Sequence, residues 1–342
     1  MVHDPASKIR VAILGATGYT ARELIGLLLR HPQVEITTLT TRQDSSPRLA
    51  DIHPLLRGRL DLPLENLSPQ EVAKRADCVF SCLPHGASAT IVESLLAKDC
   101  RVIDFSADYR LDQPEIYTKW YGVRHPAPER MAKTVYGLPE LYRKNITGAN
   151  LVANPGCYPT AAILALAPLL KEKLIRHQGI VVDSKSGVSG AGRSPKSNLH
   201  FPECNESFSA YAVGQHRHTP EIDQILSNWA TTTTSVVFTP HLVPMNRGIL
   251  TTAYADPAAD TSADALLESL QRSYAGEPFV RVVKDFPGTK DVVGTNFCDI
   301  TVRIVQNKVV VISVIDNLLK GASGAAVQNF NVMYGFDETT AL

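Results

Sequence analysis

The N-terminal region of the chain alternates between short apolar runs and one stretch of helical periodicity. Residues 9–14 (IRVAIL) form an apolar run that predicts a short buried strand. Leu24, Leu27 and Leu28 then recur at helical spacing, and residues 34–41 (VEITTLTT) are rich in the β-branched residues that strands favour. The order strand, helix, strand predicts a βαβ unit and hence a parallel sheet.

A glycine turn, GATG at residues 15–18, joins the first strand to the helix. Such a turn lets a pyrophosphate approach the backbone at a helix N-terminus, where N–H groups and the helix dipole favour anions. The turn predicts a dinucleotide-binding Rossmann domain. An ordinary strand-to-helix turn remains the alternative, because Thr17 stands where the usual motif has its second glycine. The candidate cofactor-binding residues here are Gly15, Thr17, Gly18, Tyr19 and Thr20.

Two later runs, residues 77–88 and 101–111, predict further strands that end in small polar loops. Because ligands bind at the carboxyl ends of strands in parallel sheets, Ser81 and Pro84 are also candidate cofactor contacts. The second strand is followed by Arg42, whose guanidinium suits the 2′-phosphate of NADP(H). We therefore expect NADP(H) rather than NAD(H), with a plain surface arginine as the alternative.

Composition narrows the class of protein. The 342 residues suffice for two domains, and Lys+Arg and Asp+Glu both total 34, so the net charge is zero. A balanced charge removes the usual argument for a nucleic-acid partner, and no apolar run reaches the ~18 residues of a membrane helix. The polar stretch at residues 1–10 lacks the apolar core of a signal peptide. We expect a cytoplasmic protein whose six cysteines are reduced thiols and, because they form no C-x-x-C pair, no metal site.

One of the six cysteines stands in a distinctive place. Cys157 follows the Pro155-Gly156 break and precedes an apolar, helix-like run over residues 161–170. The N-terminus of a helix favours a thiolate over a thiol, and a thiolate attacks carbonyl carbons. Cys157 is therefore the candidate catalytic nucleophile, with a small residue packed at a turn as the alternative.

A histidine-rich segment supplies a candidate acid-base group. In residues 214–226 (GQHRHTPEIDQIL), the Thr-Pro pair at 219–220 predicts a helix start with threonine as N-cap. His218 then lies in the loop just before the helix, with Glu221 within reach to orient its imidazole. A cysteine with a histidine backed by a carboxylate is an activated-nucleophile arrangement. His216 is a candidate substrate contact, and surface decoration is the alternative for the segment.

A glycine-rich loop offers backbone donors and cations to an anionic substrate. Residues 181–197 (VVDSKSGVSGAGRSPKS) predict a strand that enters a loop carrying Lys185, Arg193 and Lys196. A flexible surface loop is the alternative. The candidate substrate contacts are Lys185, Ser189 and Arg193, and the candidate cofactor contacts are Ser186 and Gly187.

Near the C-terminus, residues 311–331 predict a strand that runs into Asp316-Asn317, followed by a helix of small residues. This segment and five others, GATGYTARELI, DFSADYRL, NPGCYPT, SKSGVSGAGR and GQHRHTPEI, resemble the semialdehyde dehydrogenase superfamily. Within it they resemble the N-acetyl-γ-glutamyl-phosphate reductase family of arginine biosynthesis. The segments extend from Gly15 to Asn329, and PGCYPT and HRHTPEI are the more specific, because related dehydrogenases flank their cysteine differently.

The resemblance implies an α/β fold made of a Rossmann-type NADP-binding domain and an α+β catalytic domain with a mixed sheet. The first domain would comprise residues 1–155 with a C-terminal helix, residues 317–342, that returns to it. The second, residues 156–316, would carry the subunit interface of a homo-oligomer, a dimer or tetramer.

The resemblance also implies the reduction of a small-molecule acyl phosphate. The thiolate of Cys157 would displace phosphate from N-acetyl-γ-glutamyl phosphate and form a thioester, and NADPH would deliver hydride to give N-acetylglutamate 5-semialdehyde. His218 would be the acid-base partner, with Glu221 holding its ring. Arg110 would contact the substrate phosphate, and Asn317 would lie near the nicotinamide.

Two other functions also fit parts of the sequence. A reductase of carrier-protein-bound aminoadipyl or glutamyl phosphate, in lysine biosynthesis, shares most of the motifs. An NADP-binding regulator without chemistry is disfavoured by the intact set of Cys157, His218 and Glu221. In the aspartate-semialdehyde branch, an arginine opens an R-V-P-V-type segment and pairs with the substrate's free α-carboxylate. The corresponding position here is Leu242, so we expect an N-acylated substrate.

Overall fold

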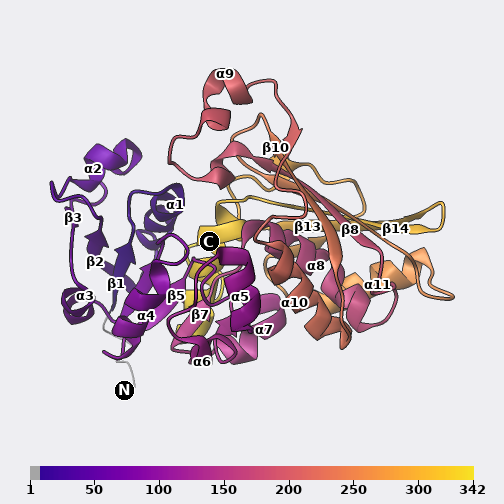
Figure 1. Cartoon of the computed structure of the whole chain (residues 1–342), viewed down its shortest axis with the longest axis horizontal. Coiled ribbons are helices and arrows are strands. Elements are labelled where there is room, and N and C mark those ends of the chain that lie inside the picture. The colour runs from indigo at the N-terminus through magenta and orange to yellow at the C-terminus, as the bar shows by residue number, and fades with distance from the viewer. Residues whose placement is uncertain (1–7) are drawn as a thin grey trace. The chain divides into compact units, whose positions relative to one another are not determined.

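The computed structural model describes residues 8–342 and divides into two compact units, each built on its own seven-stranded sheet (Figure 1). The first unit holds the described residues up to Pro155 together with Ala322–Leu342, and the second holds Gly156–Gly321. The return to the first unit therefore comes after residue 321 rather than after residue 316. The side chain of Asn317 explains the shift, because its carboxamide oxygen accepts the N–H of Gly248 at 2.8 Å within the second unit. Most of the polar stretch at residues 1–10 lies outside the described residues.

The first sheet is parallel throughout, in the order β3-β2-β1-β4-β5-β7-β6. β1 pairs with β2 on one side and with β4 on the other, so the direction of winding reverses between β1 and β4. Doubly wound sheets bind ligands at the carboxyl ends of the strands at this point. The predicted Rossmann-type fold is thus confirmed. The strands are β1 Ile9–Leu14, β2 Val34–Thr40, β3 Leu64–Glu65, β4 Cys78–Ser81, β5 Arg101–Asp104, β6 Val135–Tyr136 and β7 Leu151–Ala153.

One helix of the first unit comes from the C-terminal end of the sequence. α12 (Gly324–Tyr334) is buried along almost its whole length, including its polar residues. Polar side-chain atoms of this helix have partners within the unit: the amide nitrogen of Asn329 donates to the carbonyl of Gly137 at 2.8 Å, and Asn331 contacts His31 at 2.8 Å. A buried helix with polar residues is stable only when those groups are paired. The other helices are α1 Tyr19–Leu28, α2 Leu49–Ile52, α3 Pro69–Arg75, α4 Ser88–Leu96, α5 Pro114–Tyr121, α6 Pro128–Met131 and α7 Pro139–Ile146.

The second sheet is mixed, in the order β12-β13-β14-β11-β8-β10-β9. β8 and β10 run parallel, whereas β11 is antiparallel to both β8 and β14. This mixed sheet confirms the predicted class of the catalytic domain. The strands are β8 Ile180–Gly187, β9 Ser209–Ala210, β10 Val236–Val243, β11 Ile249–Ala255, β12 Val280–Val282, β13 Cys298–Val305 and β14 Lys308–Ile315.

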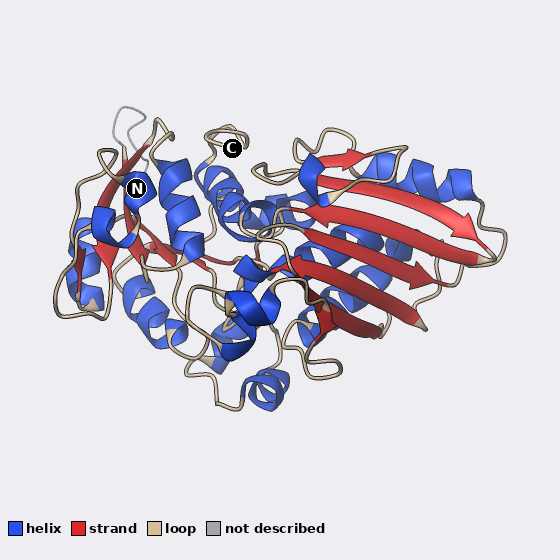
Figure 2. Cartoon of the chain, turned by 90° about the horizontal axis from the view of Figure 1, so that it is seen from above, coloured by secondary structure: helices blue, strands red, loops and turns tan. Residues whose placement is uncertain are grey.

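Helices cover one face of the second sheet: α8 (Cys157–Lys171), α10 (Thr219–Ala230) and α11 (Ala263–Ser273) all lie on the same side (Figures 1 and 2). The sequence of α8, CYPTAAILALAPLLK, is apolar around the whole circumference of the helix, as expected for a helix that is buried on all sides. Figure 2 shows the other face of the sheet without a covering helix. Along the described strands, the residues of that face stay partly exposed: Val237, Leu250, Thr252, Tyr254, Val310 and Ile312.

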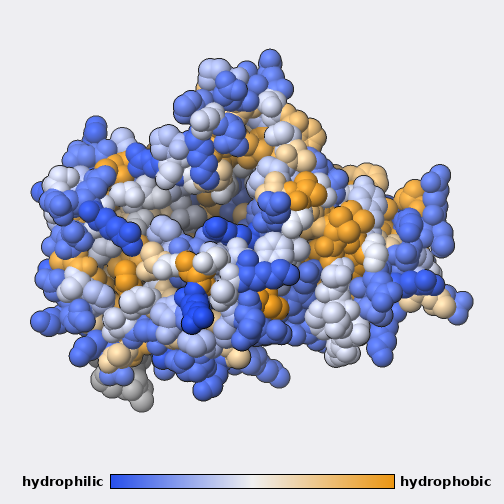
Figure 3. All heavy atoms as spheres, viewed as in Figure 1, coloured by the Kyte–Doolittle hydropathy of each residue, from blue (hydrophilic) through white to orange (hydrophobic). Residues whose placement is uncertain are grey.

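Hydrophilic residues cover most of the surface seen in Figure 3, with hydrophobic patches between them. In the second unit the most exposed large hydrophobic side chains are those of Phe201, Phe286, Phe208 and Val237. Phe201 opens the short helix α9 (Phe201–Cys204), in the segment between β8 and β10. Within residues 8–342, no helix is both long enough and apolar enough to span a bilayer.

Candidate active site

Cys157 is the first residue of α8, directly after the N-cap Gly156. The N-cap has the extended conformation usual at this position, with φ −70° and ψ 153°, and it has no side chain to cap the helix. Pro159, two residues further on, has no N–H to leave unsatisfied, so it is well placed in a first turn. The thiol thus stands at the positive end of the helix dipole, the position that favours a thiolate.

Glu221 connects the start of α10 to the start of α8. Its side chain is buried in the first turn of α10, with 1% exposure, and a carboxylate oxygen accepts the N–H of Gly156 at 2.8 Å. The acidic group predicted to hold an imidazole therefore holds the backbone of the residue before Cys157. Its role toward the ring of His218 stays a prediction.

The helix α10 begins one residue earlier than its sequence suggests. His218 rather than Thr219 is the N-cap, with helical angles of φ −81° and ψ −13°. The N–H of Thr219 donates to the carbonyl of His216 at 2.9 Å, so a turn formed by the histidine segment leads directly into the helix. His218 consequently belongs to the helix start and is held as rigidly as the helix itself.

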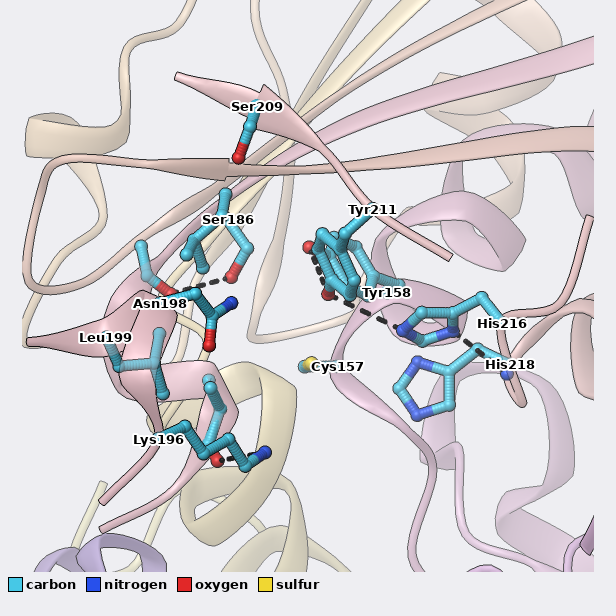
Figure 4. A pocket seen from close by; sticks show the side chains of 14 residues that line it. Cys157, Tyr158, Ser186, Lys196, Asn198, Leu199, Ser209, Tyr211, His216 and His218 are labelled. Atoms are coloured by element: carbon cyan, nitrogen blue, oxygen red, sulfur yellow. Dashed lines mark hydrogen bonds between the residues drawn. The ribbon is translucent and has the colours of Figure 1, made fainter. Parts of the chain in front are cut away.

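A cavity of about 300 Å³ lies beside Cys157, entirely within the second unit. In Figure 4 the sulfur lies between the rings of His216 and His218 on one side and the side chains of Lys196, Asn198 and Leu199 on the other. A concave site with few charged groups around a nucleophile is typical of small-molecule enzymes. The lining residues are Cys157, Tyr158, Ser186, Gly187, Gly190, Ala191, Lys196, Asn198, Leu199, Ser209, Tyr211, His216, His218 and Leu242.

The predicted site residues divide into those that line this cavity and those that do not. Cys157, His216, His218, Ser186 and Gly187 do, and so do Lys196 and Leu242, which the sequence had marked by charge and by alignment. Sequence reasoning missed Tyr158, Asn198, Leu199, Ser209 and Tyr211. Only Tyr158 had a usable signal, since it directly follows the nucleophile.

A row of polar contacts runs from the histidine segment into the sheet. The N–H of His218 donates to Nδ1 of His216 at 3.1 Å, and Nε2 of His216 lies 3.5 Å from the hydroxyl oxygen of Tyr211. The hydroxyls of Tyr211 and Tyr158 are 3.0 Å apart, and Tyr158 donates to the carbonyl of His241 at 3.2 Å. Figure 4 shows these side chains on one wall of the cavity.

Burial keeps this wall uncharged. Desolvation, with a smaller contribution from the Arg217 guanidinium, lowers the pKa of His216 to about 4. Desolvation likewise raises the pKa of Tyr211 to about 12. At neutral pH both groups are therefore neutral, and neither supplies a charge to the cavity.

Glycines leave no spare room beside the nucleophile. A Cβ on Gly321 would lie 2.8 Å from the Cβ of Cys157, and one on Gly187 would lie 2.7 Å from the carbonyl oxygen of Asn246. Real side chains do not approach so closely, so both positions require glycine. The run of small residues after Asp316 predicted such close packing, although not its partner.

Four predicted residues of the second unit do not line the cavity. Nζ of Lys185 lies 2.9 Å from Asp183, and strand alternation directs it away from Ser186, its pocket-lining neighbour. The hydroxyl of Ser189 donates to the carbonyl of Asn246 at 2.6 Å and accepts from Asn317 at 2.9 Å. Arg193 is exposed in the loop. The substrate roles of Lys185, Ser189 and Arg193 and the cofactor role of Asn317 stay predictions.

The glycine turn of the first unit fits a dinucleotide phosphate. Gly15 has φ +72°, and a Cβ there would lie 2.8 Å from the carbonyl oxygen of Cys82, so the turn is closed against the strand β4. Gly18 caps α1 without a side chain, and the first turn that follows, Tyr-Thr-Ala-Arg, contains no carboxylate. Donors at this helix start thus face no built-in anion, which suits the pyrophosphate of a nicotinamide cofactor.

The remaining predicted residues of the first unit differ in accessibility. Arg42 is exposed directly after β2, and Pro84 is exposed in the loop after β4, so both are free to meet a ligand. Ser81 is fully buried, with its hydroxyl 2.7 Å from that of Ser88, so its side chain cannot contact a cofactor without rearrangement. Arg110 is 6% exposed and donates to the carbonyl of Phe105 at 2.6 Å. Thr17, Tyr19 and Thr20 lie at the glycine turn and the start of α1.

Two family models match the chain, and the boundary between their matches lies close to the boundary between the two units. Residues 10–149 match the model described as "Semialdehyde dehydrogenase, NAD binding domain". Residues 157–317 match "Semialdehyde dehydrogenase, dimerisation domain". The first match lies within the first unit and the second match within the second unit.

Full-length relatives are about half identical to this chain. An N-acetyl-gamma-glutamyl-phosphate reductase of Rhodopirellula baltica is 52% identical, covering 98% of this chain and 99% of the relative. Proteins of the same name from Geotalea daltonii and Symbiobacterium thermophilum are 51% and 50% identical, covering 98% of this chain and 98% and 97% of the relatives.

Solved structures share the fold at much lower identity. Aspartate semialdehyde dehydrogenase II of Vibrio cholerae, in complex with ASA, gives a TM-score of 0.73 at 18% identity, over 96% of this chain and 98% of that one. The aspartate semialdehyde dehydrogenase of Candida albicans with NADP gives 0.68 at 16% identity, over 95% and 98%.

Proposed function

This chain belongs to the semialdehyde dehydrogenase family, and we propose that it reduces N-acetyl-γ-glutamyl phosphate to N-acetylglutamate 5-semialdehyde in arginine biosynthesis. The observation that carries the proposal is the cysteine at the start of α8, in a cavity that also holds His218. Relatives of about 50% identity along the whole chain bear the name of this reaction. Those names do not favour the alternative of a carrier-bound substrate in lysine biosynthesis.

The first chemical step belongs to Cys157. His218 takes the thiol proton, and the thiolate attacks the acyl carbon of the acyl phosphate. The C–S bond forms as the C–O bond to phosphate breaks, which leaves a thioester on Cys157 and releases inorganic phosphate. The helix dipole of α8 stabilises the thiolate before attack.

The second step turns the thioester into an aldehyde. A bound nicotinamide cofactor supplies the hydride. The imidazolium of His218 provides a proton to the tetrahedral oxygen and recovers it as the C–S bond of the thiohemiacetal breaks. Aldehyde leaves, and the thiolate of Cys157 is restored. Glu221, through the N–H of Gly156, holds the backbone from which Cys157 extends.

For the cofactor we propose NADPH in preference to NADH. Gly15, Thr17 and Gly18 would hold the pyrophosphate at the start of α1. Arg42, exposed at the carboxyl end of β2, would pair with the 2′-phosphate. The strand ends in threonines rather than in the acidic residue that usually binds a ribose 2′-hydroxyl.

For substrate choice we propose that Leu242 rejects substrates with a free amino-acid end. Leu242 lines the cavity at the position to which the aspartate-semialdehyde branch assigns a carboxylate-binding arginine. Both substrates carry an α-carboxylate, for which Lys196 offers the cavity a cation. A free amino acid also brings an ammonium, and the cavity lining holds no carboxylate to pair with it, at a cost of several kcal/mol. An N-acetyl group presents a neutral amide instead.

The test is phosphate-dependent reduction of NADP⁺, run in the oxidative direction with each aldehyde. We expect kcat/KM for N-acetylglutamate 5-semialdehyde to exceed that for aspartate semialdehyde by about a hundredfold or more, or ~3 kcal/mol. A Leu242→Arg variant should narrow the gap. Comparable efficiency of the two aldehydes on the parent enzyme would overturn the proposed substrate.

We propose further that the open face of the second sheet joins two copies of the chain. Its partly exposed row of Val237, Leu250, Tyr254, Val310 and Ile312 is an apolar surface that a monomer would leave in water. Light scattering of the protein and of a Tyr254→Asp variant tests this: the parent should be at least a dimer, and the variant should shift toward monomer. A monomeric parent would end the proposal.

A further inference from the structure

We infer that His216 is a positioning residue, which uses Nδ1 to hold the main-chain N–H of His218 and so fixes the backbone that presents the His218 imidazole to the cavity. The inference deepens the proposed function, because it assumes that His218 is the acid-base group. It replaces the substrate contact that the sequence suggested for His216.

The first argument concerns which atom carries each proton along the row of polar contacts from His218 to the carbonyl of His241. Nδ1 of His216 accepts the N–H of His218 at 3.1 Å, so Nδ1 carries no proton and the ring proton of the neutral imidazole is on Nε2. Tyr158 donates to the carbonyl of His241, so its oxygen accepts from Tyr211. The oxygen of Tyr211 is then left to face Nε2–H of His216 at 3.5 Å, a long contact.

Both nitrogens of His216 are therefore engaged before any substrate enters. The lone pair of Nδ1, the one that a base would use, points at the backbone. Nε2 donates along the row toward the sheet. Neither nitrogen can serve a substrate without giving up a contact, and each buried polar atom left without its partner costs roughly 1–3 kcal/mol.

The surroundings of the ring prevent it from turning. Three aromatic rings from different elements pack edge-on against it: Tyr158 of α8 at 5.5 Å, Tyr211 at 5.5 Å and Phe238 of β10 at 5.3 Å between centroids. The ring of His218 lies at 4.8 Å. The charged side chain nearest in sequence is Arg217, which opposes protonation. This wall is built to hold one neutral tautomer in one orientation.

The N–H that His216 accepts is that of the N-cap of α10. A side chain that accepts the N–H two residues further on is a local turn of the kind that asparagine and aspartate form readily. Asparagine can therefore replace Nδ1 with its carboxamide oxygen. Glutamine is one methylene longer and matches the position of Nε2 instead, so it cannot close the same turn.

These two substitutions give a matched test. His216→Asn should keep kcat for N-acetylglutamate 5-semialdehyde within about threefold of the parent, and His216→Gln should lower kcat by about tenfold or more with KM nearly unchanged. His177→Gln, in the turn between α8 and β8, is the control and should leave both constants unchanged. Tyr211→Phe removes the long contact to Nε2 together with the hydroxyl's bond to Tyr158, leaves Nδ1 engaged, and should cost about threefold or less.

A second readout needs no substrate. The rate of alkylation of Cys157 by iodoacetamide, followed by mass spectrometry of its peptide against pH, reports how well His218 supports the thiolate. The midpoint of this profile should agree between the parent and His216→Asn, and should rise in His216→Gln. Thermal unfolding of each variant confirms that it is folded, and the Tyr211→Phe comparison remains if His216→Gln is not.

Several outcomes would overturn the inference. A rise in KM with unchanged kcat in both His216 variants would make His216 a substrate contact. Equal alkylation midpoints in all folded variants, or a Tyr211→Phe loss as large as that of His216→Gln, would remove the role of Nδ1. A parent enzyme inactive on N-acetylglutamate 5-semialdehyde would reject the proposed function alone, because the alkylation profiles would still decide the role of His216.

Discussion

Two helices of this protein begin in nearly the same way and are used differently. Gly18 before α1 and Gly156 before α8 are both N-caps in the extended conformation, with φ −79° and ψ 165° and with φ −70° and ψ 153°. Neither contributes a side-chain cap. In the proposed function, the dipole at α1 receives an anion that comes from outside, whereas at α8 the anion is the thiolate of the first helical residue.

The difference lies in what the rest of the chain places at each start. At α8, the buried carboxylate of Glu221 takes the N–H of Gly156, and Gly321 closes the space beside Cys157. At α1, Gly15 bends the turn against β4 and the first turn of the helix contains no acid. In the proposed function, a helix start becomes a reactive centre when residues of the same chain bind its N–H groups and fill the space beside it. It becomes a binding site when that space is left for a ligand.

The largest expected effect on turnover is that of Cys157→Ser, which removes the thiol at the start of α8. A hydroxyl is a far weaker nucleophile than a partly ionised thiol, so turnover should fall by about a thousandfold or more. NADPH binding, measured by fluorescence titration, should change by no more than about twofold, because it depends on the other helix start. Near-normal turnover would contradict the covalent mechanism.

His218→Ala removes the proton partner and keeps the helix start of α8. We expect the rate to fall by roughly two to four orders of magnitude, the usual range for an acid-base group. Single-turnover measurements should locate the loss in formation of the thioester. If His216→Ala proves more damaging than His218→Ala, the assignment of roles to the two histidines is wrong.

Substitutions of Glu221 test how much its hydrogen bond to the N–H of Gly156 contributes to stability and turnover. Glu221→Ala leaves the buried N–H of Gly156 without its acceptor, which costs about 1–3 kcal/mol and should lower both the melting temperature and kcat, the latter by about tenfold or more. Glu221→Gln keeps an oxygen in place and is the matched control, expected within about threefold. Equal losses in the two variants would mean that the charge, rather than the hydrogen bond, matters.

Substitutions of two glycines, one in the turn before α1 and one within α1, test whether the start of α1 binds the cofactor. Gly15→Ala forces a Cβ into a positive-φ position beside Cys82, at a cost of about 1–2 kcal/mol, so the Kd for NADPH should rise by about tenfold. Gly26→Ala, in the middle of α1 with open space around it, should leave Kd unchanged and stabilise the protein slightly. Similar Kd values for both variants would argue against a cofactor at this turn.

The smallest expected effect concerns Arg42. As an exposed cation it can contribute at most about 1 kcal/mol, so Arg42→Ala should raise the KM for NADPH by up to about fivefold and leave that for NADH unchanged. Arg57→Ala, another exposed arginine of the first unit, serves as the control. Equal losses with both cofactors would show that Arg42 does not recognise the 2′-phosphate.

Much of the first unit follows from its sequence, because its signals are local. The apolar run before the glycine turn fixes β1, and the β-branched run fixes β2 almost to the residue. The runs at residues 77–88 and 101–111 form the strands β4 (Cys78–Ser81) and β5 (Arg101–Asp104), each followed by a loop as predicted. Periodicity locates an element well, but its ends depend on which backbone groups find partners.

The site was harder to predict, because its decisive contacts join distant residues. The position of Cys157 at a helix start could be inferred from Pro155-Gly156 and the apolar run after it, but Glu221 as partner of the Gly156 N–H could not. Alternation along β8 directs Lys185 to Asp183, an outcome that depends on knowing which face is covered. The cavity wall formed by Tyr211 has no sequence signal, because Tyr211 directly follows the two-residue edge strand β9, whose place is set by pairing with β10.

The return of α12 to the first unit has a consequence for synthesis. Phe330 and Asn329 are fully buried in that unit, and the carboxamide of Asn329 donates to Gly137, almost two hundred positions earlier in the chain. On the ribosome, domains generally fold in the order in which they emerge. Here the nucleotide-binding unit begins first yet lacks its last buried helix until residues 322–334 appear, by which time the whole inserted catalytic unit has been made. We therefore expect the unit that is encoded second to complete its folding first.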